Sequence, residues 1–302
     1  MSARKRSAVT KRMIKQLTSA AIVIVALAAA WIFGGEGFAP AVQTPEASGQ
    51  AMTVRFIDVG QGASTLVSMG DTHILIDAGE NDQGEKVVEQ LKAWGVTRLA
   101  LAVGTHPHSD HIGGMDDVLE AFEVDAYMMP EVAHTSQTYE SVLQVLEEKQ
   151  IPVTYPEAGD SLTLGGMRLT VLGPEQVEED DLNNCSLVSR VDSAYGSVLI
   201  PGDCEEPSET AMLKGNRPLK ADVLQLAHHG SNTSNSEAFL KAVDPQWVVI
   251  PVGEDNSYGH PHDEVLQRVE RLGYKAYRTD WNGTVTCVMD EKGIAFYPEK
   301  EP

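Results

Sequence analysis

Cysteine is scarce in this 302-residue sequence, which contains only three, Cys185, Cys204 and Cys287. None of them forms a CxxC pair, so a thiolate zinc knuckle and a redox-active dithiol are both excluded. The sequence is 42% hydrophobic and has 26 glycines and 15 prolines, a composition that excludes both a disordered chain and a fibrous one. We therefore expect a folded protein that does not use thiolates to bind structural zinc.

Basic side chains are few beyond the start of the chain. The first 34 residues hold six of the 23 Lys and Arg residues and no Asp or Glu, which leaves 17 bases against 44 acids in residues 35–302. Contacts with nucleic-acid phosphates need Lys and Arg to displace counterions. Such an acidic body is a poor non-specific binder of polyanions, so a nucleic-acid substrate would have to bind at a local site with the help of metal.

One long apolar run follows the N-terminal basic cluster, from Leu17 to Phe33. Basic residues before such a run are typical of an export signal and argue against a buried core helix. Two interpretations stay open. The alanines at 28–30 could be the cleavage site of a signal peptide, whereas the bulky residues from Trp31 onward extend the run and favour a retained signal anchor. The body is then extracytoplasmic, either secreted or anchored to the cell membrane through this one helix.

Composition divides the chain into four parts. The turn-forming residues after the apolar run show no periodicity, as expected of a tether. The parts are a basic cytoplasmic segment (1–15), a signal anchor or signal peptide (16–34), a flexible linker (35–51) and one folded domain (52–302).

The folded domain alternates between short β-branched runs and helical periodicities. Strands are expected at 53–57, 64–68, 73–76, 99–103, 161–172, 185–191, 197–201, 222–227, 247–252, 284–289 and 294–297, and near 127, 153 and 277. Helices are expected at 85–94, 115–122, 136–149, 235–243 and 262–272. Strand meanders mixed with strand–helix alternation in both halves predict two sheets faced by helices, a four-layered α/β body.

Seven of the nine histidines fall in three short clusters, at 106–111, 228–229 and 260–262. The first cluster, His106-Pro107-His108-Ser109-Asp110-His111, follows the apolar strand at 99–103, and strand ends are where α/β sheets place ligand sites. His106 and His108 are two residues apart, so in an extended stretch both can reach one metal ion. Asp110 and His111 can turn toward a second ion as the chain enters a helix. Imidazole and carboxylate ligands suit Zn²⁺, Mn²⁺ or Fe.

The other two clusters also follow predicted strands. Adjacent residues on a strand point to opposite sides, so we expect one of His228 and His229 to face the site and the other to pack against the body. The inward one would bind metal or a substrate phosphoryl oxygen. His260 is a candidate metal ligand, whereas His262 is expected to be a solvent-facing or helix-capping residue.

The motif at 106–111 resembles the HxHxDH signature of the metallo-β-lactamase superfamily. Leu75-Ile76-Asp77-Ala78-Gly79 is similar to that superfamily's strand ending in an aspartate that orients a ligand histidine. Leu199-Ile200-Pro201-Gly202-Asp203 is similar to the strand that supplies its metal-bridging aspartate. The resemblance implies an αββα fold and two divalent metal ions, Zn or Mn. The implied ligands are His106, His108, Asp110, His111, Asp203 and His260.

Within the superfamily, three further segments resemble the metallo-hydrolase domain of competence DNA-uptake channel proteins. These segments are Asp58-Val59-Gly60-Gln61-Gly62, Asn183-Asn184-Cys185-Ser186-Leu187-Val188, and His228-His229-Gly230-Ser231 with Tyr258-Gly259-His260-Pro261. The resemblance makes Asp110, His228 and His229 candidate catalytic residues. Candidates for contacts with the ligand side chains or with the substrate are Asp58, Gln61, Asp77, Asn183 and Asn184.

The sequence departs from the superfamily at one ligand. A lone histidine usually lies between HxHxDH and the bridging aspartate, and its place is held here by Asn183 and Asn184. One metal site is therefore short of a strong ligand. An amide oxygen or a water molecule could fill the position, or it could be completed only when substrate is present.

The predicted chemistry is hydrolysis by a water molecule activated between two cations. No Ser/His/Asp or Cys/His arrangement competes as a nucleophile. Three functions stay open: an exported phosphodiesterase or nuclease, which we favour, a hydrolase of another envelope phosphate ester such as a phosphocholine ester, and a non-catalytic metal-binding accessory module. The predicted partners are a phosphate-ester substrate, including nucleic acid, and the membrane.

Overall fold

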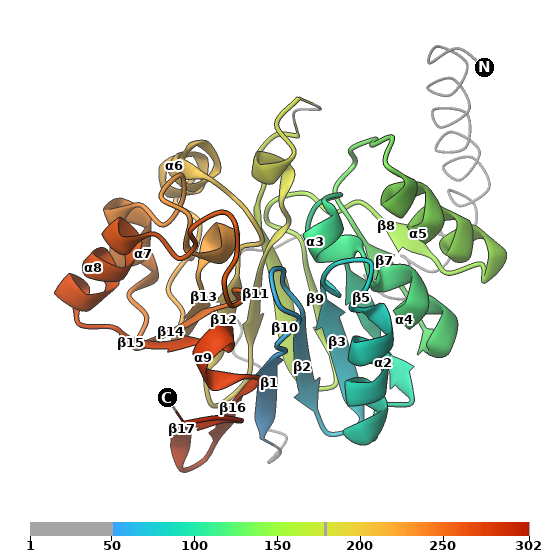
Figure 1. Cartoon of the computed structure of the whole chain (residues 1–302), viewed down its shortest axis with the longest axis horizontal. Helices are drawn as coiled ribbons and strands as arrows, with labels where there is room; N and C mark the ends of the chain where they lie inside the picture. The colour runs from blue at the N-terminus through green and yellow to red at the C-terminus, as the bar shows by residue number, and fades with distance from the viewer. Residues whose placement is uncertain (1–50, 178–179, 302) are drawn as a thin grey trace.

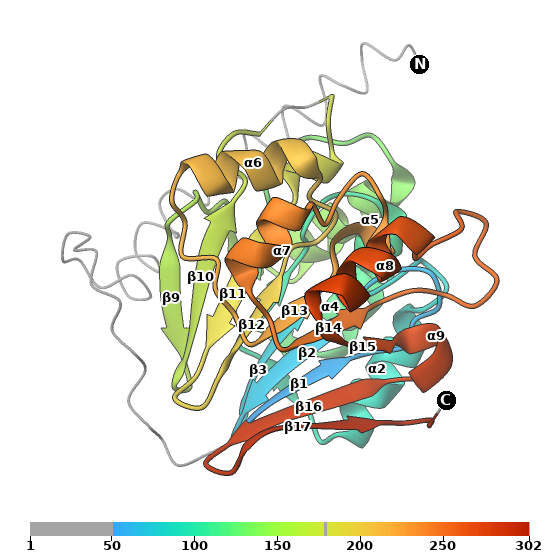
Figure 2. The ribbon, with the colours of Figure 1, turned by 90° about the vertical axis from the view of Figure 1, so that its left-hand side faces the viewer.

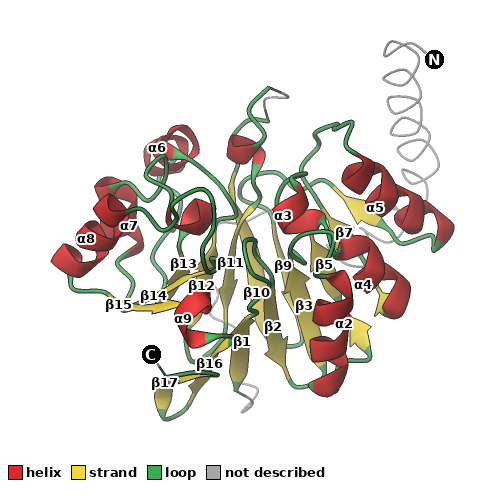
Figure 3. Ribbon diagram, viewed as in Figure 1, coloured by secondary structure: helices red, strands yellow, loops and turns green. Residues whose placement is uncertain are grey.

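The computed structural model describes residues 51–177 and 180–301 and contains two large β-sheets that pack face to face (Figures 1 and 3). The first has eight strands in the order β17 (Gly293–Pro298), β16 (Val285–Asp290), β1 (Met52–Phe56), β2 (Thr65–Met69), β3 (Thr72–Ile76), β5 (Leu101–Val103), β7 (Tyr127–Met128) and β8 (Val153–Thr154). The second has seven, in the order β15 (Lys275–Arg278), β14 (Trp247–Ile250), β13 (Val223–Gln225), β12 (Ser197–Ile200), β11 (Val188–Asp192), β10 (Met167–Gly173) and β9 (Ser161–Leu164). A small third sheet pairs β4 (Arg98–Leu99) with β6 (Glu123–Val124).

Helices cover the outer face of each large sheet, as the two views in Figures 1 and 2 show. On the first sheet they are α2 (Gly84–Ala93), α3 (Ser109–Ile112), α4 (Met115–Ala121) and α5 (Gln137–Glu148). On the second they are α6 (Glu206–Lys214), α7 (Glu237–Val243) and α8 (Asp263–Leu272). Short helical turns occur at η1 (Asn183–Cys185), η2 (Ala227–Gly230) and α9 (Thr279–Asn282).

The buried side chains form three apolar layers. The central layer joins the inner faces of the two sheets, for example Val54 and Ile74 from the first and Leu169 and Val198 from the second. The other two layers pack each sheet against its own helices. Burial of apolar area is the main favourable term in folding, so this arrangement explains the predicted four-layered α/β body.

Most predicted elements lie within a few residues of the observed ones, and the differences have local causes. The strand predicted at 161–172 is the hairpin of β9 and β10, because Gly165 and Gly166 take positive φ angles of 56° and 91° and turn the chain. Helix α6 was not predicted. Its buried positions include the polar Ser208 and Glu209 with Met212, so the segment lacks the apolar periodicity that marks a surface helix.

The described ranges contain no helix long and apolar enough to cross a membrane. The predicted signal segment from Leu17 to Phe33 and nearly all of the predicted linker lie outside those ranges.

Candidate metal centre

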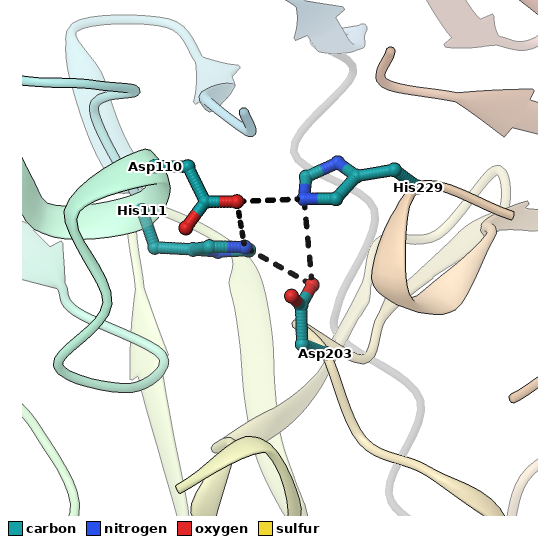
Figure 4. A group of neighbouring side chains, drawn as sticks. All are labelled: Asp110, His111, Asp203 and His229. Carbon is teal, nitrogen blue, oxygen red and sulfur yellow. Dashed lines mark hydrogen bonds and ion pairs between the residues drawn. The ribbon is translucent and has the colours of Figure 1, made fainter. Parts of the chain in front are cut away.

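Five strands of the two sheets end at the same place and deliver the polar residues of the site. Asp77 follows β3, the HxHxDH segment follows β5, and Asp203 follows β12. His229 lies in η2 after β13, and His260 lies in the loop after β14. Figure 4 shows that the side chains converge from both halves of the molecule.

The loop at 58–62 holds α3 in place by close backbone contact. Gly62 has a φ of +146°, and a Cβ on it would lie 2.5 Å from the carbonyl oxygen of Asp110. The same oxygen accepts a hydrogen bond from the Ala63 backbone N–H at 3.0 Å. Only glycine fits this approach, so the Asp58-Val59-Gly60-Gln61-Gly62 motif fixes the backbone that carries Asp110.

Four side chains form a first donor group: Asp110, His111, Asp203 and His229. One ligand atom from each lies within 4.8 Å of all the others. His111 Nε2 lies 3.0 Å from Asp203 Oδ1, and His229 Nε2 lies 3.1 Å from Asp110 Oδ2 (Figure 4).

A second donor group faces the other oxygen of Asp203. Asp203 Oδ2 lies 3.8 Å from His106 Nε2 and 3.7 Å from His228 Nε2. His106 Nε2 in turn lies 3.0 Å from His108 Nδ1. The two oxygens of one carboxylate therefore face two different sets of imidazoles, the arrangement needed for a ligand that bridges two cations.

The histidine rings are oriented by acceptors behind them. Asp77 Oδ2 accepts from His111 Nδ1 at 2.7 Å, and the Pro251 carbonyl accepts from His229 Nδ1 at 2.8 Å. Glu205 Oε1 lies 3.2 Å from His228 Nδ1. A hydrogen bond at Nδ1 leaves Nε2 with its lone pair directed into the site, which is how outer residues prepare metal-binding histidines.

The donor atoms fit divalent cations on two grounds. His111 Nε2 and Asp203 Oδ1 are buried 3.0 Å from each other and make no hydrogen bond to another group in the described part of the chain, and buried polar atoms with so few partners are costly unless a ligand uses them. Carboxylate oxygen with imidazole nitrogen is also the donor set of Zn²⁺, Mn²⁺ and Fe sites.

The charges differ between the two groups. Burial is the largest single influence and opposes protonation of His111 and His229, but the neighbouring carboxylates together outweigh it and raise the pKa of both rings. Asp203 is first among these carboxylates, followed by Asp77 and Asp110 at His111 and by Asp110 at His229. Burial opposes ionisation of Asp203, but His111 and His229 hold its pKa well below the usual value. In the second group, burial and the nearby His111 lower the pKa of His106. Without metal, protons therefore neutralise the first group, whereas His106 keeps a free lone pair.

We expect metal uptake by the first group to release protons. The pKa values of His111 and His229 are raised, so both rings are protonated at pH values where an ordinary imidazole is neutral, and only the neutral ring binds metal. As the pH is lowered, affinity should begin to fall while the pH is still above ~6.5, and it should drop about tenfold per pH unit for each proton displaced. Calorimetric titration of Mn²⁺ into metal-free protein at several pH values measures this slope, and an affinity that does not change with pH would contradict it.

The expectation that His228 and His229 point to opposite sides is wrong. Strand β13 ends at Gln225, and both histidines take left-handed conformations in η2, with φ angles of 51° and 54°. His229 is buried and His228 is partly exposed, yet each has a nitrogen within 3.8 Å of Asp203. The alternation argument fails because it applies only to extended strands.

The structure separates the roles of the two asparagines. Asn184 Oδ1 accepts the backbone N–H groups of Glu205 at 3.0 Å and Ser208 at 3.2 Å, so it caps the start of α6 and is not available to replace the missing histidine. Asn183 donates to Glu205 at 3.3 Å, and its own Oδ1 is buried without a hydrogen bond in the described part of the chain. Of the two, Asn183 is the one with an amide oxygen to offer.

The remaining predicted residues surround the centre. His260, one of the implied ligands, is outside the first donor group, which contains His229 instead. The ring of His260 stacks on that of His229 at a centroid distance of 6.2 Å. His262 precedes α8, and its Nδ1 accepts a hydrogen bond from the Asn232 backbone N–H.

Two predicted residues support the loops around the centre. Asp58 accepts from the Gly60 N–H at 3.1 Å, and Gln61 accepts from the Gly253 N–H at 3.2 Å. These last two contacts support the loops that carry the ligands.

Sequence reasoning missed Glu205 and Thr105. Glu205 contacts His228 and Asn183, and Thr105 Oγ1 donates to Asp77 Oδ2 at 2.8 Å. Both lie within two residues of a predicted ligand, Asp203 and His106, and their proximity in sequence was the available signal.

Comparisons with known proteins agree with this geometry. Residues 57–253 match the model of the metallo-beta-lactamase superfamily. The chain is 33% identical over 252 residues to ComE operon protein 3 of Bacillus subtilis, covering 77% of this chain and 32% of that protein. It is 32% identical over 255 residues to competence protein ComA of Neisseria gonorrhoeae, covering 81% of this chain and 34% of that protein. The chain thus spans about a third of the length of these curated relatives.

The fold is also found in solved structures. Igni18, a metallo hydrolase from Ignicoccus hospitalis, superimposes with a TM-score of 0.52 at 19% identity, covering 78% of this chain and 98% of that one. At this identity the likeness concerns the fold alone. The family match, the competence-protein relatives and the converging carboxylates and imidazoles together confirm the resemblance seen in the sequence: the chain belongs to the metallo-beta-lactamase superfamily.

Proposed function

We propose that this protein hydrolyses phosphodiesters with two divalent cations, and that nucleic acid is the substrate class. The observation that carries the proposal is Asp203, whose two oxygens face separate sets of imidazoles. Paired cations at such a site lower the pKa of water and neutralise charge on a phosphoryl group. The competence proteins to which the chain is similar support nucleic acid as the substrate.

The chain's own residues would divide the work. Asp203 would hold both cations at a fixed separation, and Asp77 would keep His111 in the tautomer that binds metal. His228 is the more exposed of the two adjacent histidines, with 21% of its side chain accessible against 2% for His229, and Glu205 fixes its orientation. We assign His228 to the substrate side of the centre, where its ring can contact a phosphoryl oxygen.

The test is turnover by the full chain after metal removal and stepwise return of Mn²⁺ or Zn²⁺. We expect cleavage of single-stranded DNA and of bis(p-nitrophenyl) phosphate to appear with the metal and to disappear with a chelator. Metal content should be measured on the same samples, so that loss of activity can be assigned to loss of the ion. Metal-loaded protein that cleaves no phosphodiester contradicts the proposal.

The acidic composition favours a second candidate, a hydrolase of a zwitterionic envelope phosphate ester. Residues 35–302 carry 44 acids against 17 bases, and a phosphocholine ester would not be repelled by such a surface as a polyanion is. Adding p-nitrophenyl phosphorylcholine to the substrates tested distinguishes this candidate from the nucleic-acid phosphodiesterase. If the metal-loaded protein cleaves neither nucleic acid nor the phosphocholine ester, the remaining candidate is an accessory metal-binding module.

We also propose that the folded domain lies outside the cytoplasmic membrane. The support is the sequence, in which six basic residues precede the apolar run from Leu17 to Phe33. Protease added to intact cells, with the outer membrane permeabilised where there is one, should digest the domain while a cytoplasmic marker stays intact. Protection that is lost only on lysis would contradict the proposal.

A further inference from the structure

An exposed tyrosine lies beside the metal centre. Tyr258 is 65% exposed, the highest value among the large hydrophobic residues of the described chain that stand out at the surface. Its ring stacks on His260 at a centroid distance of 5.6 Å and an interplanar angle of 22°. His260 stacks in turn on His229 of the first donor group, at 6.2 Å and 26°. A series of stacked rings therefore leads from the surface to a metal-binding side chain.

The loop that carries Tyr258 is held by its own hydrogen bonds. Asn256 Nδ2 donates to the carbonyls of Gly253 at 3.0 Å and His260 at 2.7 Å, and Asn256 Oδ1 accepts from the His260 N–H at 3.0 Å. These bonds close the loop on both sides of Tyr258. The ring is thus presented in a set position, and little ordering would be needed when a ligand binds to it.

Packing does not account for the exposed ring. No hydrogen bond from the Tyr258 hydroxyl is found within residues 51–177 and 180–301, and two-thirds of the side chain is open to solvent. Residues 251–262 contain no Lys or Arg but include the exposed acids Glu254 and Asp255. The loop can therefore offer a substrate a flat ring, and it offers no cation for a phosphate.

We propose that Tyr258 is a specificity-determining residue that stacks on a nucleobase next to the phosphodiester at the metal centre. The inference rests on the proposed function and names the part of the substrate that is recognised. Stacking on an aromatic side chain is strong and tolerates any base sequence. It gives an acidic protein an uncharged way to hold a nucleic-acid strand that its surface would otherwise repel.

The proposal can be tested by binding, independently of turnover. The probes are a fluorescein-labelled, phosphorothioate-linked thymidine decamer and a decamer of equal charge in which abasic residues replace the nucleosides. We expect the Mn²⁺-loaded full chain to bind the base-bearing strand about tenfold more tightly, and Tyr258→Ala to remove that preference while leaving abasic binding unchanged. Tyr258→Phe and Tyr258→Trp should keep it, because both retain a flat ring.

Tyr297→Ala is the matched control, because Tyr297 is 60% exposed on the edge strand β17. It should bind both strands as the wild type does, and the metal content of every variant should be unchanged. With a cleavable DNA strand, Tyr258→Ala should raise KM about tenfold and leave kcat unchanged.

Equal binding of the two strands by the wild type, or a preference that survives in Tyr258→Ala, overturns the inference. Absence of cleavage together with a Tyr258-dependent preference for bases would overturn the proposed hydrolysis alone.

Discussion

Replacing Asp203 by Asn should lower phosphodiester turnover by about a thousandfold or more. The carboxylate has one oxygen 3.0 Å from His111 and the other 3.8 Å from His106. An amide has nearly the same shape, but only one oxygen, so its NH₂ group must face one of the two imidazole sets. At least one cation would lose its bridging ligand, and the metal content should fall with the activity.

The measurement combines steady-state turnover, metal analysis and urea unfolding. The fold should persist, because Asp203 follows the end of β12 and its ligand atoms face the site, outside the apolar layers. Asp116→Asn, a half-buried aspartate on α4, is the control and should keep full activity. Near wild-type turnover in Asp203→Asn with unchanged metal content would contradict a two-cation centre.

Replacing Glu209 by Ala should destabilise the protein by about 3 kcal/mol. Glu209 lies on α6 with no exposed surface, and its two oxygens accept the backbone N–H groups of Asn235 at 2.6 Å and Ser236 at 3.0 Å. Removing the carboxylate leaves two N–H groups buried without acceptors. Urea unfolding measures the loss, and Glu206→Ala, an exposed residue of the same helix, should change stability little.

The same substitution should weaken metal binding about tenfold, although Glu209 touches no ligand. Asn235 Oδ1 accepts from the Ala227 N–H at 3.0 Å, and its Nδ2 donates to the Ala227 carbonyl at 2.9 Å, which clamps the start of η2. The next two residues are His228 and His229 in left-handed conformations, which cost free energy unless the surroundings hold them. Metal affinity equal to that of the wild type, in a folded Glu209→Ala protein, would show that Glu209 acts on stability alone.

Local sequence was sufficient for the parts of the molecule that depend on chain direction and periodicity. The order of strands and helices follows from short β-branched runs and apolar spacing, and the position of His106, His108 and His111 follows from their place after β5. The N-cap position of His262 was also predictable, because the residue precedes a helix with strong periodicity, although its side chain makes no capping hydrogen bond. In each case the signal lies within a few neighbouring residues.

The tertiary structure alone decided which donors meet. The sequence does not show that Asp203 faces His111 and His229 with one oxygen and His106 and His228 with the other, because that depends on the left-handed turn at η2. Nor does it show that Asn184 is used as a helix cap, since the N–H groups it accepts belong to residues 21 and 24 positions away. The physical reason is the same for both. Periodicity reports which side of an element is buried, whereas the ligand geometry depends on backbone angles and hydrogen bonds between segments that are brought together only by packing of the two sheets.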